Sequence, residues 1–158
     1  MLEFAESPIC AEGARSRSLG MTLHLSINLS FDGQCEDAFK FYEQCLNGKI
    51  AFKLTWGDSP MAKDAPQHWR EKIVHETLIV GDTTFSGGDA LPGTYVRPQG
   101  FGILLGLKEL EDAEHLFHAL AENGTVHVPW QETFWALRFG SVTDQFGIPW
   151  DINCEKAE

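Results

Sequence analysis

The chain has 158 residues, 43% of them hydrophobic, which is enough for one domain with a packed core. Its 12 Lys and Arg against 23 Asp and Glu give a formal net charge of -11. This balance argues against nucleic-acid and anionic-membrane partners, because both require a basic patch, and no apolar run approaches the roughly 20 residues of a membrane span. We therefore expect a cytoplasmic protein.

The first 20 residues have no sustained hydrophobic period and no apolar segment long enough for a signal peptide. We expect a disordered leader over residues 1–20, followed by a single domain over residues 21–158. The four cysteines, Cys10, Cys35, Cys45 and Cys154, form no CxxC pair, so the sequence predicts neither a zinc knuckle nor a redox dithiol.

The first half of the domain contains one helix and four strands. Apolar and polar residues alternate strictly from Leu23 to Phe31, which predicts a half-buried strand. Residues 35–46 have apolar side chains at helical spacing and end at Asn47-Gly48, a typical helix stop. Strand patterns follow at 49–56, 73–80 and 83–88, with a long polar loop over 57–72. Residues 23–90 therefore predict a βαβββ module.

The second half repeats this order of elements, and residues 100–154 predict a second βαβββ module. An offset of 76 residues relates equivalent positions of strand, helix and helix stop: Ile27 and Ile103, Phe41 and Phe117, Asn47 and Asn123. One helix cannot cover both faces of a four-stranded sheet. We therefore expect an α+β fold in which each helix covers one sheet face and the opposite faces enclose a concave cavity.

Large aromatic residues and charges are concentrated in residues 130–153. This segment holds three of the five tryptophans, interleaved with Glu132, Arg138, Asp144, Asp151 and Asn153. Aromatic rings beside a few polar groups are typical of a ligand-enclosing surface. A well-packed core hairpin would have the same composition, so both interpretations stay open.

Several segments resemble the vicinal-oxygen-chelate superfamily, which includes glyoxalase I, extradiol dioxygenases and bleomycin-resistance proteins. They are residues 29–42 (LSFDGQCEDAFKFY), 86–92 (SGGDALP), and 130–135 (WQETFW) through 146–150 (FGIPW). The chain is most similar to the PhnB-like branch, often named 3-demethylubiquinone methyltransferase-like. The resemblance implies paired βαβββ modules, a homodimer and a small-molecule site in the concavity. The chain lacks the Gly-rich turn and the α/β alternation of common S-adenosylmethionine enzymes, so we do not expect methyltransferase activity.

The metal-dependent members of this superfamily place His or Glu at four inward positions. The resemblance puts these positions at about Ser26, Ser86, Gly102 and Asp151, of which only Asp151 is a credible ligand. Asn28 or His24 could substitute on the first strand. We therefore expect no metal and no cofactor, with a divalent metal as the alternative.

Two acidic residues are the candidate catalytic groups. Asp151 could act as a general base or pair with a cationic ligand, or it could form a structural salt bridge with Arg138. Glu132 could close the mouth of the cavity, or it could be a solvated loop carboxylate. His75 has the position of a structural histidine. The predicted ligand-binding residues are Ser26, Asn28, Trp56, Trp130, Trp135, Arg138, Phe139, Trp150 and Asn153.

Three functions remain compatible with the sequence. The first is binding of a small aromatic or amphipathic molecule without a metal. The second is an enzyme, a lyase, isomerase or dioxygenase, that uses a metal or one of the acids Asp151 and Glu132 as base. The third is a structural dimer with a vestigial pocket.

Overall fold

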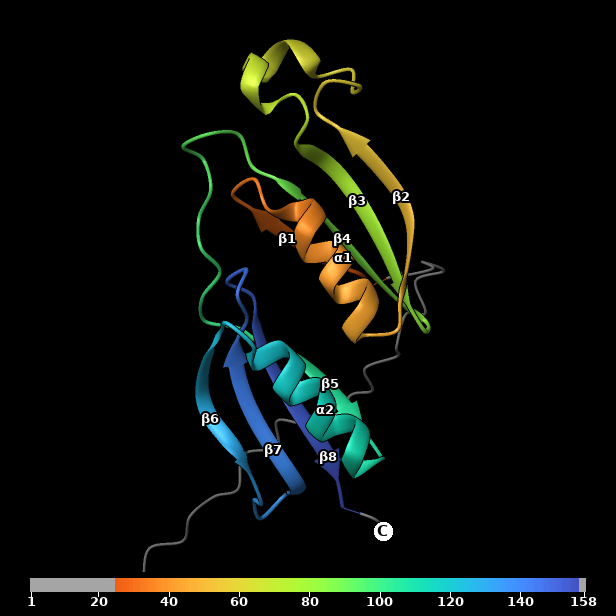
Figure 1. Ribbon diagram of the computed structural model, residues 1–158, viewed down its shortest axis with the longest axis vertical. Helices are drawn as coiled ribbons and strands as arrows, with labels where there is room; N and C mark the ends of the chain where they lie inside the picture. The colour runs from red at the N-terminus through yellow and green to blue at the C-terminus, as the bar shows by residue number, and fades with distance from the viewer. Residues whose placement is uncertain (1–24, 157–158) are drawn as a thin grey trace, which may run out of the picture.

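Two modules with the same order of elements lie one above the other along the long axis of the molecule (Figure 1). The computed structural model describes residues 25–156, so the predicted leader lies outside the described residues. The first module contains β1 (Ile27–Phe31), α1 (Cys35–Cys45), β2 (Lys49–Thr55), β3 (Ile73–Val80) and β4 (Thr83–Asp89). The second contains β5 (Ile103–Leu107), α2 (Leu110–Ala121), β6 (Thr125–Gln131), β7 (Ala136–Thr143) and β8 (Pro149–Glu155). Two short 3-10 helices, Ala62–Asp64 and Gln67–Trp69, interrupt the loop between β2 and β3.

The two sheets have equivalent strand orders, β1-β4-β3-β2 in sheet one and β5-β8-β7-β6 in sheet two. In both sheets the first strand runs parallel to the last, and the other pairs are antiparallel. Ile27 lies opposite Phe85 in sheet one, and its repeat equivalent Ile103 lies opposite Trp150 in sheet two. The predicted α+β fold of two βαβββ modules is confirmed.

The helix boundaries follow from local chemistry. Asn47 and Asn123, just after the two helices, have φ angles of 50° and 56°, which asparagine tolerates better than most residues. Asp89, at the end of β4, accepts the backbone N–H groups of Cys35 and Ile73, each at 2.9 Å. The carboxylate therefore satisfies a donor at the start of α1 and ties the helix to sheet one.

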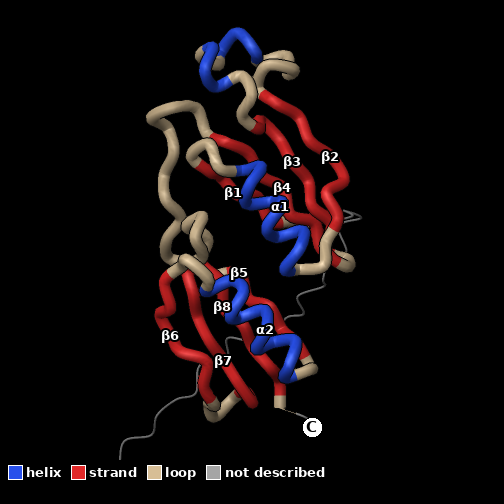
Figure 2. The backbone as a smooth tube through the Cα atoms, in the orientation of Figure 1, coloured by secondary structure: helices blue, strands red, loops and turns tan. Residues whose placement is uncertain are grey.

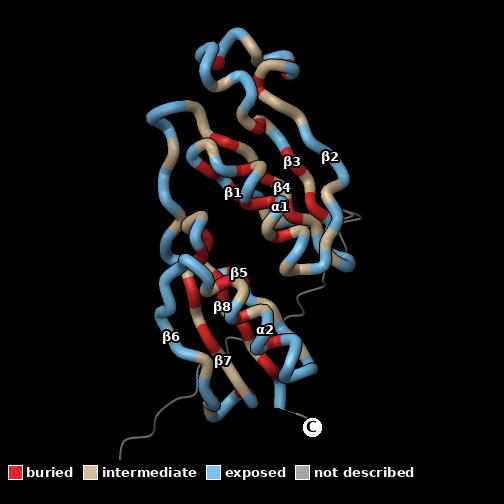
Figure 3. Tube along the Cα trace, in the orientation of Figure 1, coloured by how far each residue is buried: buried red, intermediate tan, exposed pale blue. Residues whose placement is uncertain are grey.

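Both helices lie on the same side of the two sheets (Figures 1 and 2). Buried positions alternate along the strands that they cover, as Figure 3 shows. Leu29 and Leu78 of sheet one and Ile103 and Ile152 of sheet two are among the buried residues of this core. We call the sheet faces opposite the helices the open faces, because no helix of residues 25–156 covers them.

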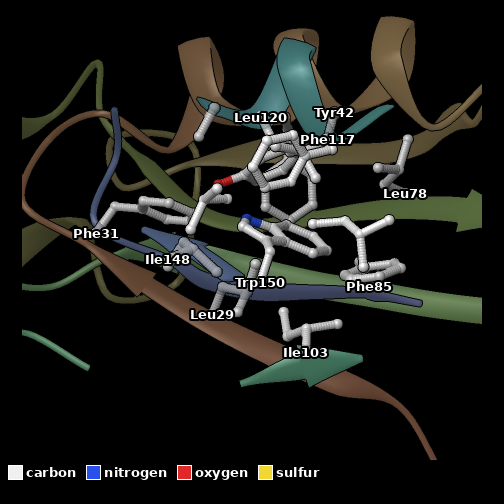
Figure 4. Close-up of a cluster of buried hydrophobic side chains, with 14 of the residues drawn as sticks. Leu29, Phe31, Tyr42, Leu78, Phe85, Ile103, Phe117, Leu120, Ile148 and Trp150 are labelled. Atoms are coloured by element: carbon white, nitrogen blue, oxygen red, sulfur yellow. The ribbon is translucent and has the colours of Figure 1, made fainter. Parts of the chain in front are cut away.

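A buried hydrogen-bond network joins the modules. The hydroxyl of Tyr42 in α1 donates to Oδ2 of Asp144 at 2.5 Å, and Nε1 of Trp150 donates to the same oxygen at 2.8 Å. The backbone N–H groups of Phe146 and Ile148 donate to Oδ1 at 2.8 and 3.0 Å. The turn at Asp144 therefore also connects α1 to β8. Figure 4 shows Tyr42 and Trp150 in the shared core.

Candidate functional site

The open face of sheet two brings together most of the predicted site residues of the second module. Asp151 and Asn153 project from β8 two positions apart, so their side chains lie on the same face. On β7, Ser141 lies opposite Asp151 and Phe139 lies opposite Asn153. All four residues are partly buried, which leaves each with some surface for a ligand.

An aromatic pair and a glycine border this cluster. The Trp135 ring packs edge to face on Phe139, with centroids 5.6 Å apart, and 53% of Trp135 is exposed. A Cβ atom added at Gly102 would lie only 2.7 Å from Oδ2 of Asp151. The two positions that the family resemblance pairs in this module are therefore neighbours in space.

The open face of sheet one is lined by small polar groups. Asn28 of β1 lies opposite Ser86 of β4. Ser26 lies two positions before Asn28, and both are exposed. A cavity of about 160 Å³ lies here, and its walls include Asn28 and His75. The His75 ring lies 5.9 Å from the Phe52 ring, and its Nε2 lies 3.2 Å from the Thr77 hydroxyl.

The donor set at the four family metal positions does not fit a divalent ion. Ser26 and Ser86 supply neutral hydroxyls, and only Asp151 supplies a charge. Gly102 has no side chain, and the Asp151 carboxylate takes the space that a longer residue would need. Among residues 25–156, no group of three or more His, Cys, Asp and Glu side chains could hold a metal ion.

Three predicted ligand-binding tryptophans lie away from the open faces. Trp150 is 0% exposed and belongs to the core. Trp130 stacks on Phe117 of α2 with centroids 5.3 Å apart, so it lies on the helix side. Trp56 is 9% exposed and donates its Nε1 proton to the Asp89 carbonyl at 3.0 Å. This placement differs from the expectation that they line the site, and the core-hairpin interpretation of residues 130–153 applies to Trp130 and Trp150.

The two remaining charged candidates are also separated from the cluster. Arg138 lies opposite Cys154, one position out of phase with Asn153, and no ion pair within residues 25–156 joins it to Asp151. Glu132 is an exposed loop carboxylate whose Oε1 lies 3.9 Å from Nζ of Lys156. The solvated-carboxylate interpretation fits Glu132, and the predicted salt bridge between Asp151 and Arg138 is not formed.

Sequence reasoning missed a buried carboxyl group beneath α1. Glu76 is 1% exposed, and its Oε2 accepts a long hydrogen bond of 3.8 Å from the Cys35 thiol. Burial raises the pKa of Glu76 to about 7 and also raises the pKa of Cys35. The signal was present in the strand pattern, because Glu76 alternates in phase with Leu78 and Val80 on the helix-covered face.

Sequence reasoning also missed a large cavity between the modules. Its volume is about 780 Å³, and it extends along the free edge of β5. We call it the inter-module groove. Most of its lining is apolar: Cys45, Leu46, Val80, Leu104, Leu105, Leu107, Leu116 and Ala119, with Asn47, Thr83, Asp112 and His115 among the polar residues. Its residues come from distant parts of the sequence, so no local pattern could predict it.

Comparison with known proteins identifies the family. Residues 23–152 match the Glyoxalase/Bleomycin resistance protein/Dioxygenase superfamily. Protein YjdN of Escherichia coli (strain K12) is 34% identical over 142 residues, which cover 85% of this chain and 97% of YjdN.

Two solved structures have the same fold. Protein PA1353 from Pseudomonas aeruginosa is 40% identical with a TM-score of 0.77, covering 86% of this chain and 100% of that one. The PhnB protein from Bacillus cereus is 18% identical with a TM-score of 0.72, covering 84% of this chain and 99% of that one. Within residues 25–156, no helix combines the length and apolar character that crossing a membrane requires. The two-module fold and the match over residues 23–152 agree, and the chain belongs to the Glyoxalase/Bleomycin resistance protein/Dioxygenase superfamily.

Proposed function

We propose that this protein binds a small amphipathic molecule on its open faces without a complete set of metal ligands, as a cytoplasmic homodimer in which the partner completes the site. The observation that carries the proposal is the open face of sheet two. There, the partly exposed Trp135 and Phe139 lie on the same face as Asn153, whose Oδ1 has no hydrogen-bond partner in the described chain, and Asp151, which forms no ion pair within residues 25–156. Ligand sites commonly combine apolar walls with a few such polar groups.

Exposed apolar side chains on both open faces support the proposal that a ligand or a second copy of the chain covers these faces. Phe52 on sheet one is 50% exposed, while Leu104 and Trp135 on sheet two are 63% and 53% exposed. Each of these side chains is exposed to solvent, whereas the apolar residues on the helix-covered faces are buried. Burial of apolar surface contributes about 25 cal/mol per Å², so covering these rings and chains with a ligand or a second copy is favourable.

The sheet edges support a dimer. The outer strand β2 carries Lys49 and Lys53, and the outer strand β6 carries Pro129, both of which discourage pairing with another strand. The other two edge strands, β1 (Ile27–Phe31) and β5 (Ile103–Leu107), contain no charged residue and no proline. These two unprotected edges, with the inter-module groove beside β5, are where we place the contact with a second copy.

An enzymatic role remains the second candidate because of one carboxylate. Asp151 is partly exposed on the sheet face that also carries Phe139, and such a group can accept a proton from a bound substrate. Glu132 lacks this setting, since it is exposed beside Lys156. If the protein is an enzyme, Asp151 is therefore the base of a lyase or isomerase reaction.

The test uses the full chain in two measurements. Light scattering during size-exclusion chromatography should give the mass of a dimer, and a thermal-shift screen of amphipathic molecules should give hits. The hits should disappear in Trp135→Ala and persist in Met61→Ala, which removes a comparably exposed side chain from the loop between β2 and β3. A monomer with no hit would overturn the proposal, and turnover of a hit that Asp151→Asn abolishes would establish the enzyme.

A further inference from the structure

Two hydrogen-bond acceptors on the open face of sheet two lack a donor among the residues that the structure describes. Oδ1 of Asn153 is almost completely buried, although the residue as a whole is partly exposed, and it has no hydrogen-bond partner in the described structure. The Asp151 carboxylate, two positions earlier on the same face, forms no ion pair within residues 25–156. A buried carbonyl oxygen without a donor is unfavourable, so this face is built for a group that brings donors with it.

Residues 25–156 pair no cation with the Asp151 carboxylate on this face. Gly102 lies beside the Asp151 carboxylate and has no side chain, and any Cβ there would meet Oδ2 at 2.7 Å. Arg138 is the basic residue of β7, but it lies opposite Cys154 and its Nη1 donates to the Leu137 carbonyl at 3.1 Å. The negative charge of Asp151 is therefore available to a ligand.

Aromatic rings complete the environment. Phe139 lies opposite Asn153, and Trp135 packs on Phe139 with a centroid separation of 5.6 Å. The negative face of an aromatic ring attracts an ammonium or guanidinium group within about 6 Å of its centroid, and tryptophan does so best. The same rings provide apolar surface for the rest of a ligand.

We propose that the molecule bound on this face carries a protonated amine or a guanidinium group joined to an apolar or aromatic body. The cation pairs with Asp151 and donates to Oδ1 of Asn153, while the body packs on Trp135 and Phe139. This inference rests on the proposed binding function and adds the chemical class of the ligand. The chain's net charge of -11 also favours the approach of a cation over that of an anion.

The experiment compares three probes that share a phenyl ring and differ in charge: phenethylammonium, 2-phenylethanol and 3-phenylpropanoate. Affinities are measured with the full-length protein by isothermal titration calorimetry, with ligand-observed NMR for weak binding. Phenethylammonium should bind at least about tenfold more tightly than either of the others, the difference expected for one charge-assisted contact.

Two variants locate the effect. Asp151→Asn should lower the affinity for phenethylammonium about tenfold and leave that for 2-phenylethanol within about twofold. Asp82→Asn removes the same charge from the exposed β3–β4 turn and should change neither affinity. Its result separates a contact with Asp151 from a general effect of net charge.

The outcomes distinguish this inference from the function on which it rests. Equal binding of all three probes, unaffected by Asp151→Asn, would overturn the proposal that the ligand is a cation. The proposed binding function would still stand. Failure of every probe to bind at millimolar concentration would overturn both proposals. Stoichiometric binding of Mn²⁺ or Zn²⁺ that displaces phenethylammonium and requires Asp151 would replace the organic cation by a metal ion.

Discussion

The hydroxyl of Tyr42 is expected to be the strongest single polar contact between the modules. Tyr42 is 0% exposed and donates at 2.5 Å to Asp144, which is itself 3% exposed. Burial and the neighbouring carboxylate raise the pKa of Tyr42, so the hydroxyl keeps its proton. Tyr42→Phe removes this donor without removing the ring. A buried hydrogen bond to a charged group contributes about 1.5–3 kcal/mol.

The expected cost of Tyr42→Phe is about 2 kcal/mol, because Asp144 retains the Trp150 indole and two backbone N–H groups and is not left unpaired. For a protein of this size, that corresponds to a fall in Tm of about 4–8 °C. The assays are urea unfolding followed by tryptophan fluorescence and differential scanning calorimetry. Tyr95→Phe is the matched control, since it removes the chain's other tyrosine hydroxyl, which forms no hydrogen bond within residues 25–156. Equal stabilities of the two variants would refute the reasoning.

Three further perturbations test the packing. Because burial raises the pKa of Glu76 from 4.5 to about 7, its contribution to stability falls as the pH rises between these values. Glu76→Gln should remove this dependence and stabilise the fold above pH 7 by at most about 3 kcal/mol in urea titrations. Gly140→Ala should cost about 1–3 kcal/mol, since its Cβ would collide with Phe117, whereas Gly106→Ala should cost less, since its Cβ would meet only Oε1 of Glu155 at 3.8 Å. Asn123→Ala should lower the Tm because φ is 56° there, and a rise in Tm would contradict this argument.

Repetition made the fold predictable from the sequence. A period of two residues marks the strands and a period near 3.6 marks the helices, and the offset of 76 residues fixes their equivalence. The structure places Ile27 and Ile103 at the same register position in their sheets, as this offset requires. The first strand is shorter than predicted, since Leu25 is 83% exposed and precedes β1. Alternation of apolar and polar residues locates a strand in the sequence. It does not show where the neighbouring strand ends, and pairing with that neighbour sets the length of the strand.

The site was harder to predict than the fold. The side of the sheet on which a side chain lies can be counted from the sequence only where the two-residue alternation of the strand is unbroken. The pairing of β6 with β7 shifts register between Val126 and Val128 and again between Val128 and Gln131. These irregularities change which side of the sheet a residue faces. Trp130 therefore packs on the helix side, although counting residues along an ideal strand places it with Glu132. Trp135 and Phe139 follow the shift and lie together.

Two aspartates seven residues apart show how the surroundings, rather than the residue type, divide structural from functional acids. Asp144 receives four hydrogen bonds, from Tyr42, Trp150 and two backbone N–H groups, so its charge is already satisfied and holds the modules together. Asp151 forms no ion pair within residues 25–156, lies beside Gly102, and shares its sheet face with Phe139. Both carboxylates are partly removed from water in the fold, and among residues 25–156 only Asp144 receives hydrogen bonds that compensate for this loss. A carboxylate such as that of Asp151 is stabilised when a ligand brings a cation or a hydrogen-bond donor to it. This is the physical reason to place the ligand there.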